Sequence, residues 1–586
     1  MGIAKNQEFE ITIEDIGNDG EGIGHVEGIA VFVKDAVPGD VARIKIIKDK
    51  KRYAYGRLME IIKPSIDRVT PICPHAKACG GCSIMQLSYD KQLVWKQNKV
   101  ENCLKRIGGI ENAKELMEPI IGMKDDAYDH AGGEAGNRIL TDDRTLADDR
   151  ILKSDRTSLY GGKIYGDRKL TADIIEEGFP AIRYRNKAQF PVGRDKDGNI
   201  VIGFYAGRTH SIIDTDVCYL QHPVNDEIIR KFRGFLEEYN VEPYDEEKHT
   251  GLVRHILTRV GKHTGEVMVC VIINGDELTG TRSYDDEHVS LKPGNNRKKN
   301  GSFKVKHINV EHELVSCMKD IPGITSIVLN TNKEKTNRIL GDKCRTIWGS
   351  ETITDYIGDV KYQINPLSFF QVNPTQTAKL YQKALEYAEL TGDETVWDLY
   401  CGIGTISLFL AQKAKRVMGV EIIPEAIYDA RKNAKLNGLE NAEFFVGKAE
   451  EVLPREYEKN GIYADVIVVD PPRKGCDIVA LNTMLKMAPK RIVYVSCDPA
   501  TLARDLKILT EATDDKNNVM YEVKKVCAVD QFSHSGHVET VVQLVNIGVK
   551  PDYTVRLEVD VDEFYKTVGE EKRHFVKPDQ KNKEDK

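Results

Sequence analysis

Four short runs of β-branched and aromatic residues dominate the first sixty positions of the chain. EFEITIEDI, IAVFVKDA, DVARIKIIKDK and YAYGRLMEII alternate apolar with polar residues or run β-branched, and turn signals such as NDGEG and VPGD separate them. Alternation of this kind is typical of half-buried strands. So many strands in so short a stretch predict a small OB-like β-barrel over residues 1–63, a fold that often binds nucleic acid.

The next part of the chain, residues 64–350, has the mixed pattern of an α+β domain. LVRHILTRV and EVMVCVIING are typical strands, and LSYDKQLVWKQNKVENCLKRIG has helical spacing. Two stretches, about 124–177 and about 279–302, are rich in charged and turn-forming residues. In the first of them arginine recurs every sixth residue, at Arg138, Arg144, Arg150 and Arg156. A repeat unit this short buries little core, so we expect both stretches to be flexible inserted loops.

Residues 351–545 alternate between strands and helices. VWDLYC, RVMGVE, ADVIVVD and RIVYVSC are short apolar runs, and the segments between them have helical spacing. This order predicts a doubly wound, mostly parallel sheet of the Rossmann-like α/β class. The remaining segment, 546–586, ends in the charged KPDQKNKEDK and is an extension to which the sequence assigns no role.

Each of these four strands ends in a distinctive polar residue or loop. Gly402 and Gly404 follow the first strand, Glu421 ends the second, Asp470 ends the third and Cys497 ends the fourth. In a doubly wound sheet, ligands bind in the crevice outside the carboxyl ends of the strands. We therefore expect these groups to face one crevice, with the glycines admitting a ligand close to the backbone and Glu421 placed to take a ribose hydroxyl pair.

Cys497, in RIVYVSCDPATLARDL, has two interpretations. Cysteine is among the most buried residue types and can serve as a small core residue. A thiol at a strand end beside a helix N-terminus is also favoured as a thiolate nucleophile. The position alone leaves both interpretations open.

Several motifs together resemble one family. SCDPATLARD, DPPRKG, FFQVNPTQT, DLYCGIGTISL and HVETVVQL are similar to motifs of the RNA (uracil-5-)-methyltransferase family, and specifically of the bacterial 23S ribosomal RNA (uracil-5-)-methyltransferases. The resemblance spans residues 8 to about 545 outside the two inserts, and the N-terminal barrel resembles a TRAM domain. One departure is Asp498, where the family often has Asn.

The resemblance implies S-adenosylmethionine (SAM) as methyl donor and gives each site residue a role. The SAM-binding positions of the family fall on Gln371, Tyr400, Glu421 and Asp470. Its nucleophile falls on Cys497, and its general base falls on Glu539 in HVET. A thiolate that adds to carbon 6 of uracil makes carbon 5 an enolate carbon that attacks the methyl group, and a base then removes the carbon-5 proton.

Other residues compete for these roles. Cys401 lies in the glycine loop, Cys476 lies in the PPRKGCD loop, and His537 is a rival to Glu539 because a neutral imidazole also accepts a proton. Phe369 and Phe370 could stack on an extruded base or belong to the core.

A second group of cysteines lies in PICPHAKACGGCSIMQ. Cys73, Cys79 and Cys82 have the spacing C-x5-C-x2-C, and a soft metal site needs a fourth ligand, for which Cys218 is the candidate. Zinc held by four cysteines is one interpretation. The resemblance favours a 4Fe-4S cluster with a structural or RNA-positioning role, which makes residues 64–350 a central domain with a cysteine cluster.

Composition changes this picture little. The chain has 586 residues, 41% hydrophobic and 30% charged, with a net charge of −7 and twelve cysteines. No apolar run reaches the length of a membrane span, and the first residues lack the apolar core of a signal peptide. We expect a cytoplasmic, monomeric protein without a membrane partner. Although its net charge is negative, the chain contains locally basic stretches such as IIKDKKRYAYGR.

Three functions are compatible with the motifs. The first is SAM-dependent methylation of carbon 5 of a uridine in 23S ribosomal RNA. The second is the same reaction on transfer RNA, although the bacterial transfer-RNA enzymes that this family resembles generally lack both the barrel and the cysteine cluster. The third is a non-catalytic iron–sulfur RNA-binding protein, which the presence of Cys497 and Glu539 disfavours.

Overall fold

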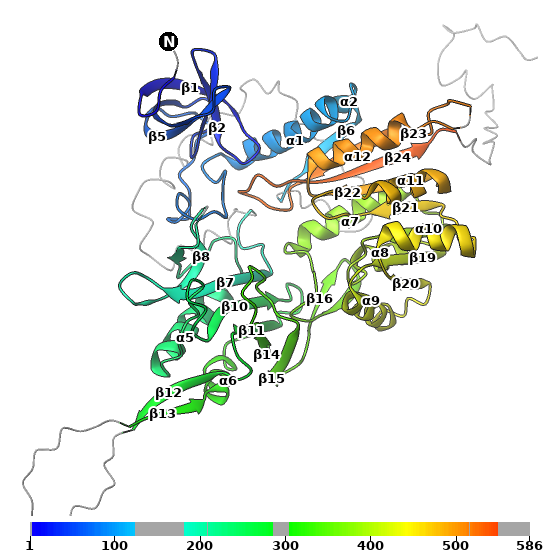
Figure 1. Ribbon diagram of the computed structural model, residues 1–586. Helices are drawn as coiled ribbons and strands as arrows, with labels where there is room; N and C mark the ends of the chain where they lie inside the picture. The colour runs from blue at the N-terminus through cyan, green and yellow to red at the C-terminus, as the bar shows by residue number, and fades with distance from the viewer. Residues whose placement is uncertain (1–2, 124–180, 208, 285–303, 515, 549–586) are drawn as a thin grey trace, which may run out of the picture.

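A computed structural model describes residues 3–123, 181–207, 209–284, 304–514 and 516–548 of the chain (Figure 1). The Arg repeat, the segment 285–303 and nearly all of the C-terminal extension therefore lie outside the described residues. Within the described part, no helix is long and apolar enough to cross a membrane.

The N-terminal residues form the predicted barrel. Five strands close in the order β1-β2-β3-β5-β4. They are β1 (Glu8–Ile16), β2 (Gly22–Val26), β3 (Ile29–Val33), β4 (Val41–Asp49) and β5 (Tyr53–Lys63). Alternate residues point inward, and the core is built from fully buried side chains such as Val31, Ile44 and Ala54. The barrel confirms the sequence prediction because each strand has one apolar face.

The central region is built on a seven-stranded sheet in the order β15-β14-β11-β10-β7-β8-β9. Its strands are β7 (Lys187–Arg194), β8 (Ile200–Tyr205), β9 (Ile212–Asp214), β10 (Val253–Val260), β11 (Val267–Ile273), β14 (Ile324–Thr331) and β15 (Lys343–Gly349). Helices α5 (Val224–Glu238) and α6 (Glu311–Met318) pack against each other beside it. All residues of β10 and β11 are buried, which explains the continuous apolar run of β11, whereas β10 also buries Arg254, His255, Thr258 and Arg259.

A two-stranded hairpin lies in part of the stretch expected to be a loop. β12 (Thr279–Tyr284) pairs with β13 (Lys304–Asn309) in antiparallel register. The expected loop at 279–302 is therefore corrected at its start, where residues 279–284 form a strand. Its partner strand is KVKHIN, which lies beyond the expected loop. The β-branched residues of KVKHIN favour a strand, although the charged residues around it suggest a loop.

The C-terminal region is an eight-stranded sheet in the order β20-β19-β18-β21-β22-β24-β23-β6. Its strands are β18 (Thr395–Leu399), β19 (Arg416–Glu421), β20 (Ala442–Val446), β21 (Val466–Val469), β22 (Arg491–Ser496), β23 (Tyr521–Val529) and β24 (Glu539–Asn546), with β6 (Met117–Ile121) at the edge. β24 runs antiparallel to β22, whereas β18, β19, β20, β21 and β22 are parallel. Strand β6 therefore belongs to this sheet, although the sequence pattern assigned its residues to the central domain.

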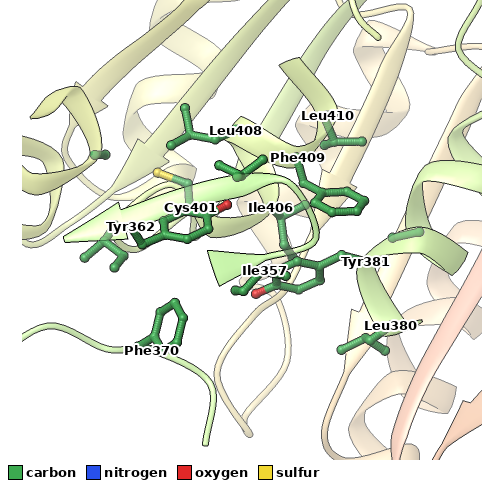
Figure 2. Close-up of a cluster of buried hydrophobic side chains, with 14 of the residues drawn as sticks. Ile357, Tyr362, Phe370, Leu380, Tyr381, Cys401, Ile406, Leu408, Phe409 and Leu410 are labelled. Atoms are coloured by element: carbon green, nitrogen blue, oxygen red, sulfur yellow. The ribbon is translucent and has the colours of Figure 1, made fainter. Parts of the chain in front are cut away.

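Helices cover both faces of this sheet. The helices of one face are α7 (Pro374–Ala388), α8 (Thr405–Ala411) and α9 (Pro424–Leu436). The hairpin of β16 (Ile353–Ile357) and β17 (Val360–Ile364) precedes α7 in the chain and packs into the same core. The helices of the other face are α10 (Ala449–Asn460), α11 (Ile478–Met487), α12 (Pro499–Glu511), α1 (Tyr89–Arg106) and the short α2 (Ala113–Leu116). Figure 2 shows the core of the first face, where Tyr381 and Phe409 lie beside Ile406. This is the predicted doubly wound architecture.

The loop between β23 and β24, residues 530–538, is held by side chains of other regions. Lys96 of α1 forms an ion pair of 2.5 Å with Asp530, and both side chains are fully buried. The hydroxyl of Tyr89 donates to the other oxygen of Asp530 at 2.7 Å. Lys96 also donates to the carbonyl of Phe532 at 2.8 Å. Helix α1 therefore anchors the loop that leads into β24.

The central region and the barrel hold the same loop. Tyr184 donates to the carbonyl of Ser533 at 3.3 Å, and Ser533 donates to the carbonyl of Ala181 at 2.6 Å. Lys99 donates to Gly536 at 2.9 Å and to Asn18 of the barrel at 3.1 Å. The loop is consequently a junction of all three regions, and Figure 1 shows α1 running from the barrel toward the eight-stranded sheet.

The buried ion pair predicts a large effect of a single substitution. Lys96→Met should lower the free energy of unfolding by about 3–5 kcal/mol, because it leaves the Asp530 carboxylate buried without its cation. Lys96→Met combined with Asp530→Asn should recover part of that loss. Urea unfolding followed by tryptophan fluorescence measures both effects.

Lys105→Met on the same helix is the matched control for this prediction. Lys105 pairs with Glu101 at 2.7 Å on a partly exposed surface, so its loss should cost less than about 1 kcal/mol. Equal stability of the Lys96→Met and Lys105→Met proteins would contradict the anchoring role of Lys96.

Candidate active site

The ends of the parallel strands lie side by side at one edge of the eight-stranded sheet. Leu399, the last residue of β18, pairs with Val420 of β19 on one side and with Val469 of β21 on the other. Val469 in turn pairs with Tyr494 of β22. From β18 the chain adds β19 and β20 on one side and then crosses back to add β21 and β22 on the other side. This change of direction makes the gap between β18 and β21 the place where a doubly wound sheet binds ligands.

The antiparallel pairing of β22 with β24 brings a thiol and a carboxyl group together. Ser496 pairs with Thr540, so the next positions outward are Cys497 on one strand and Glu539 on the other. Glu539 is 4% exposed, whereas Cys497 is partly exposed. The two residues are distant in sequence, and the pairing of β22 with β24 places them opposite each other at the strand ends.

Two buried acidic side chains, Glu539 and Asp470, lie near these strand ends. Burial raises the pKa of Glu539, and the nearby Asp470 carboxyl raises it further, whereas Arg473 lowers it. Burial likewise raises the pKa of Asp470. Because two buried carboxylates repel each other, this pair holds a proton at a higher pH than isolated carboxyl groups do.

The Cys497 thiol is affected by the same groups. Burial raises its pKa to about 11, and the negative charges of Glu539 and Asp470 add to the increase, whereas Arg473 lowers the pKa. Asp498 caps α12 by accepting from the backbone N–H groups of Ala500 at 2.9 Å and Thr501 at 3.0 Å. Asp498 therefore fills the capping role that Asn can also play, and the departure from the family pattern leaves the helix start intact.

The glycine loop after β18 keeps open space beside the backbone. A Cβ atom at Gly402 would meet nothing within 4 Å, and both Gly402 (φ 55°) and Gly404 (φ 80°) adopt left-handed backbone conformations. Glu421 accepts from the N–H of Gly402 at 3.2 Å and from that of Ile423 at 3.0 Å. These hydrogen bonds fix Glu421 beside the glycine loop.

Gln371 and Tyr400 are the other two residues to which the family resemblance gives a role in binding the methyl donor, besides Glu421 and Asp470. Gln371 is 7% exposed, and its carbonyl accepts from the side chain of Asn186 at 3.0 Å, which ties the segment before α7 to the central sheet. Tyr400 directly follows β18 with a left-handed φ of 69° and packs toward the core on the α10–α12 face. A non-glycine residue held in this conformation is a strained position of the kind found at functional sites.

The two phenylalanines before Gln371 have different environments. Phe370 is 2% exposed and packs against Tyr362, with ring centroids 5.8 Å apart (Figure 2). Phe369 is 68% exposed. Of the two, Phe369 is available to a base and Phe370 belongs to the core.

The rival thiols are less accessible than Cys497. Cys401 and Cys476 are both buried, and burial raises the pKa of Cys476 to about 12. The backbone N–H of Cys476 donates to Asp505 at 2.8 Å, in the core beneath α12. The rival base, His537, has its ring 6.1 Å from that of Phe532, and burial followed by the positive charge of Arg473 lowers its pKa.

The second cysteine group gathers in one place without forming a ligand set. Cys73, Cys82 and Cys218 pack around the same small apolar cluster, and the pKa values of Cys73 and Cys82 are raised first by burial and then by the other thiols, Cys79 included. Nevertheless, no three His, Cys, Asp or Glu side chains in the described ranges are placed to hold a metal ion. The predicted metal centre therefore stays a prediction, based on the proximity of these thiols to one another.

One buried acid was not predicted from the sequence. Asp398 lies within β18 and is fully buried, with the hydroxyl of Ser407 donating to it at 2.5 Å. Burial raises its pKa to about 7, and Asp470 and Glu421 contribute to the increase. Its signal in the sequence is a single acid inside the apolar run VWDLYC, a pattern that is also typical of an ordinary strand.

Comparison with known proteins agrees with the geometry. Residues 350–547 match the tRNA (Uracil-5-)-methyltransferase family, and residues 4–59 match the TRAM domain. An uncharacterized RNA methyltransferase of Halalkalibacterium halodurans is 43% identical over 92% of this chain and 98% of its own length. One from Clostridium acetobutylicum is 42% identical over 93% of this chain and 98% of its own.

A solved structure covers nearly the whole chain. It is the tRNA (uracil-54, C5)-methyltransferase of Pyrococcus abyssi in complex with S-adenosyl-L-homocysteine. The match has a TM-score of 0.61 and 25% identity, and it covers 92% of this chain and 100% of the other.

The raised carboxyl pKa values predict how stability depends on pH. The folded protein holds protons on Asp470 and Glu539 that the unfolded chain releases near pH 4, so these groups make stability fall as pH rises above that value. Glu539→Gln removes one of the two charges. It should therefore leave stability near pH 4 unchanged and raise it by about 1–3 kcal/mol at pH 9, because a pKa that differs by one between the folded and unfolded chain corresponds to ~1.4 kcal/mol.

Urea unfolding at pH 4, 6.5 and 9 measures this gain. Glu440→Gln, at an exposed position, is the control and should be neutral at every pH. A Glu539→Gln protein less stable than the unsubstituted chain at pH 9 would contradict the repulsion between the two acids.

Proposed function

We propose that this chain, which belongs to the RNA (uracil-5-)-methyltransferase family, methylates carbon 5 of a uridine in 23S ribosomal RNA through a covalent bond between Cys497 and carbon 6 of the base. The carrying observation is the pairing of β22 with β24, which places Cys497 opposite Glu539. One strand end thus presents a partly exposed thiol, and the neighbouring strand start presents a carboxyl group whose pKa is raised.

In the proposed reaction, the Cys497 thiolate bonds to carbon 6, and the electron pair of the 5,6 double bond moves into the enolate. SAM, when bound, would supply an electrophilic methyl group to carbon 5, and the bond between that methyl group and the sulfonium sulfur would break with its electron pair left on sulfur. Glu539 takes the proton from carbon 5, the double bond forms again, and the bond between Cys497 and carbon 6 breaks. The raised pKa of Glu539 suits a base that must hold a proton near neutral pH.

Binding of the methyl donor is assigned to Gln371, Tyr400, Glu421 and Asp470. Glu421 and the open space at Gly402 suit a ribose beside the glycine loop. Asp470 lies within electrostatic range of Glu539 and Cys497, so a cation bound there would relieve the repulsion that raises the pKa values of Glu539 and Cys497. Cofactor binding and activation of the thiol are coupled in this way.

Transfer RNA is the second candidate substrate. The Pyrococcus abyssi enzyme, whose name specifies a uracil in transfer RNA, matches this chain over 92% of its length. The barrel and the cysteine-rich segment favour ribosomal RNA through the family resemblance. Methyl transfer from labelled SAM to purified 23S ribosomal RNA and to bulk transfer RNA, followed by mass mapping of 5-methyluridine, distinguishes the two.

Two substitutions should separate the catalytic roles. Cys497→Ala should abolish both methylation and covalent capture of RNA, because no enolate forms without addition to carbon 6. Glu539→Gln should lower turnover by about 10²–10⁴-fold, while a methylated, covalent enzyme–RNA complex accumulates. Denaturing gels and labelled SAM measure both outcomes.

Cys476→Ala is the control for Cys497→Ala, since it removes a thiol of the same region that is buried in the core. It should retain covalent capture. Methylation by the Cys497→Ala protein, or normal turnover by the Glu539→Gln protein, would overturn the assigned roles.

We further propose that Cys73, Cys79, Cys82 and Cys218 bind a 4Fe-4S cluster with a structural role. Supporting this are the shared apolar cluster of three of these residues and the electrostatic coupling of their thiols to Cys79. Thiolates in one small region are the ligand type that iron–sulfur clusters require. Methyl transfer to an enolate needs no redox step, so the cluster would serve folding.

Protein purified without oxygen should therefore be brown and contain iron. Cys79→Ser should lose the colour and lower the melting temperature, because metal binding contributes to folding free energy. Cys344→Ser, at an exposed cysteine outside the group, is the control and should keep the iron. Colourless protein with stoichiometric zinc would refute the iron–sulfur assignment.

A further inference from the structure

Three aromatic rings gather on the outside of the barrel. Phe32 of β3 lies with its ring centroid 5.7 Å from that of Tyr53 and 5.8 Å from that of Tyr55, both on β5. The two tyrosine rings are 5.7 Å apart and nearly perpendicular. All three side chains are half-buried. We call Phe32, Tyr53 and Tyr55 the aromatic face.

The register of the strands directs these rings outward. Phe32 pairs with Tyr55 across the β3–β5 ladder, and the residues on either side of Phe32, Val31 and Val33, are fully buried in the barrel core. Because successive side chains in a strand point to opposite faces, the three rings lie on the outer surface. The core beneath them is already filled, so they are not needed to close it.

The rings are held in place rather than loose. A Cβ atom added at Gly17 would lie 3.3 Å from the ring of Phe32, which shows that this ring rests on the backbone of the β1–β2 turn. Tyr53 meets both other rings edge-on. Side chains that are fixed before binding lose little conformational entropy when a ligand stacks on them.

Positive charge flanks the aromatic face. The hairpin from residue 45 to residue 57 contains six Lys or Arg residues and one acid, in a chain whose net charge is −7. Lys48 pairs directly with Tyr55 across the β4–β5 ladder. Lys48, Lys50, Lys51 and Arg52 are all exposed, and within the described residues none of the four forms an ion pair. Exposed cations around clustered aromatic rings match a polyanion that carries aromatic bases.

We propose that the aromatic face stacks unpaired bases of the RNA substrate while the 45–57 hairpin contacts the adjacent phosphates. The inference deepens the proposed function, on which it rests, by assigning the barrel to single-stranded rather than duplex RNA. Stacking requires bases whose faces are free, and a duplex hides those faces. Lys99 joins the barrel to the loop that precedes Glu539. RNA bound to the barrel is therefore bound to a region that contacts the candidate active site.

The test uses the full chain and two fluorescent RNAs, an unstructured strand of about 12 nucleotides, which falls within the site size of one small barrel, and a duplex. The substituted protein carries Phe32→Leu, Tyr53→Leu and Tyr55→Leu, which keep apolar side chains but remove the rings. It should bind the single strand about 10- to 100-fold more weakly and the duplex as before. On saturating RNA its kcat should be unchanged while KM rises.

A second variant tests the charges separately. Lys50→Ala, Lys51→Ala and Arg52→Ala together should reduce the slope of log affinity against log salt concentration, because fewer counterions are released. The ring variant should leave that slope unchanged. Arg43→Ala is the matched control on the barrel, since Arg43 is already paired with Glu60 at 2.9 Å. Tyr463→Leu, an aromatic residue 64% exposed outside the barrel, is the control for the rings.

Each outcome decides the inference. Unchanged single-strand binding by the ring variant, with its thermal melting intact, overturns it. Equal losses for single strand and duplex, or loss with Tyr463→Leu as well, also overturn it, because the rings would then lack selectivity for unpaired bases. RNA affinity is measured without methyl transfer. Failure of the proposed function would therefore appear as an unsubstituted protein that binds RNA and methylates none.

Discussion

The reversal of β24 within an otherwise parallel run is the constraint on which the candidate site depends. β18, β19, β21 and β22 all end at one edge of the sheet, and a further parallel strand would also have ended there. Because β24 runs against β22, it begins at that edge instead, and Glu539 stands beside Cys497. In a parallel β24 the same residue would lie at the opposite edge, roughly 27 Å away at about 3.4 Å per residue. Antiparallel pairing therefore places a carboxyl group beside the thiol without any insertion.

This arrangement gathers acids in a buried place and so costs stability. Burial raises the pKa of Asp470 and Glu539, Asp470 raises that of Glu539 further, and both acids raise the pKa of the Cys497 thiol, whereas Arg473 lowers the pKa of Glu539 and Cys497. An exposed arginine offsets buried repulsion only partly, because solvent screens its charge. A site that is destabilised while empty and relieved by a cationic ligand binds that ligand more tightly than its contacts alone would suggest.

Much of this organisation is predictable from local patterns. Alternation along β1 and β4 predicts a barrel, and apolar runs ending at Glu421 and Cys497 predict the parallel sheet, because periodicity records which face of an element is buried. β6 is different. It pairs with β23, whose residues lie about four hundred positions later, and no local pattern specifies so distant a partner. For the same reason, FFQ does not reveal that Phe370 packs on Tyr362 while Phe369 stays exposed.

The loop of residues 530–538 shows the same limit and connects recognition with chemistry. DQFSHSGHV has the composition of an ordinary polar loop, yet Asp530, Gln531 and Ser533 are fully buried because other regions provide their hydrogen-bond partners. Withdrawing one partner leaves a buried polar group unsatisfied, at about 1–3 kcal/mol for each group. Lys96 and Lys99 of α1 reach this loop, and Lys99 also reaches the barrel. The start of β24, and with it Glu539, is thus positioned by the barrel, α1 and the central region together. A displacement of the barrel would disturb the proposed base through these contacts, so the position of Glu539 depends on how all three regions are docked.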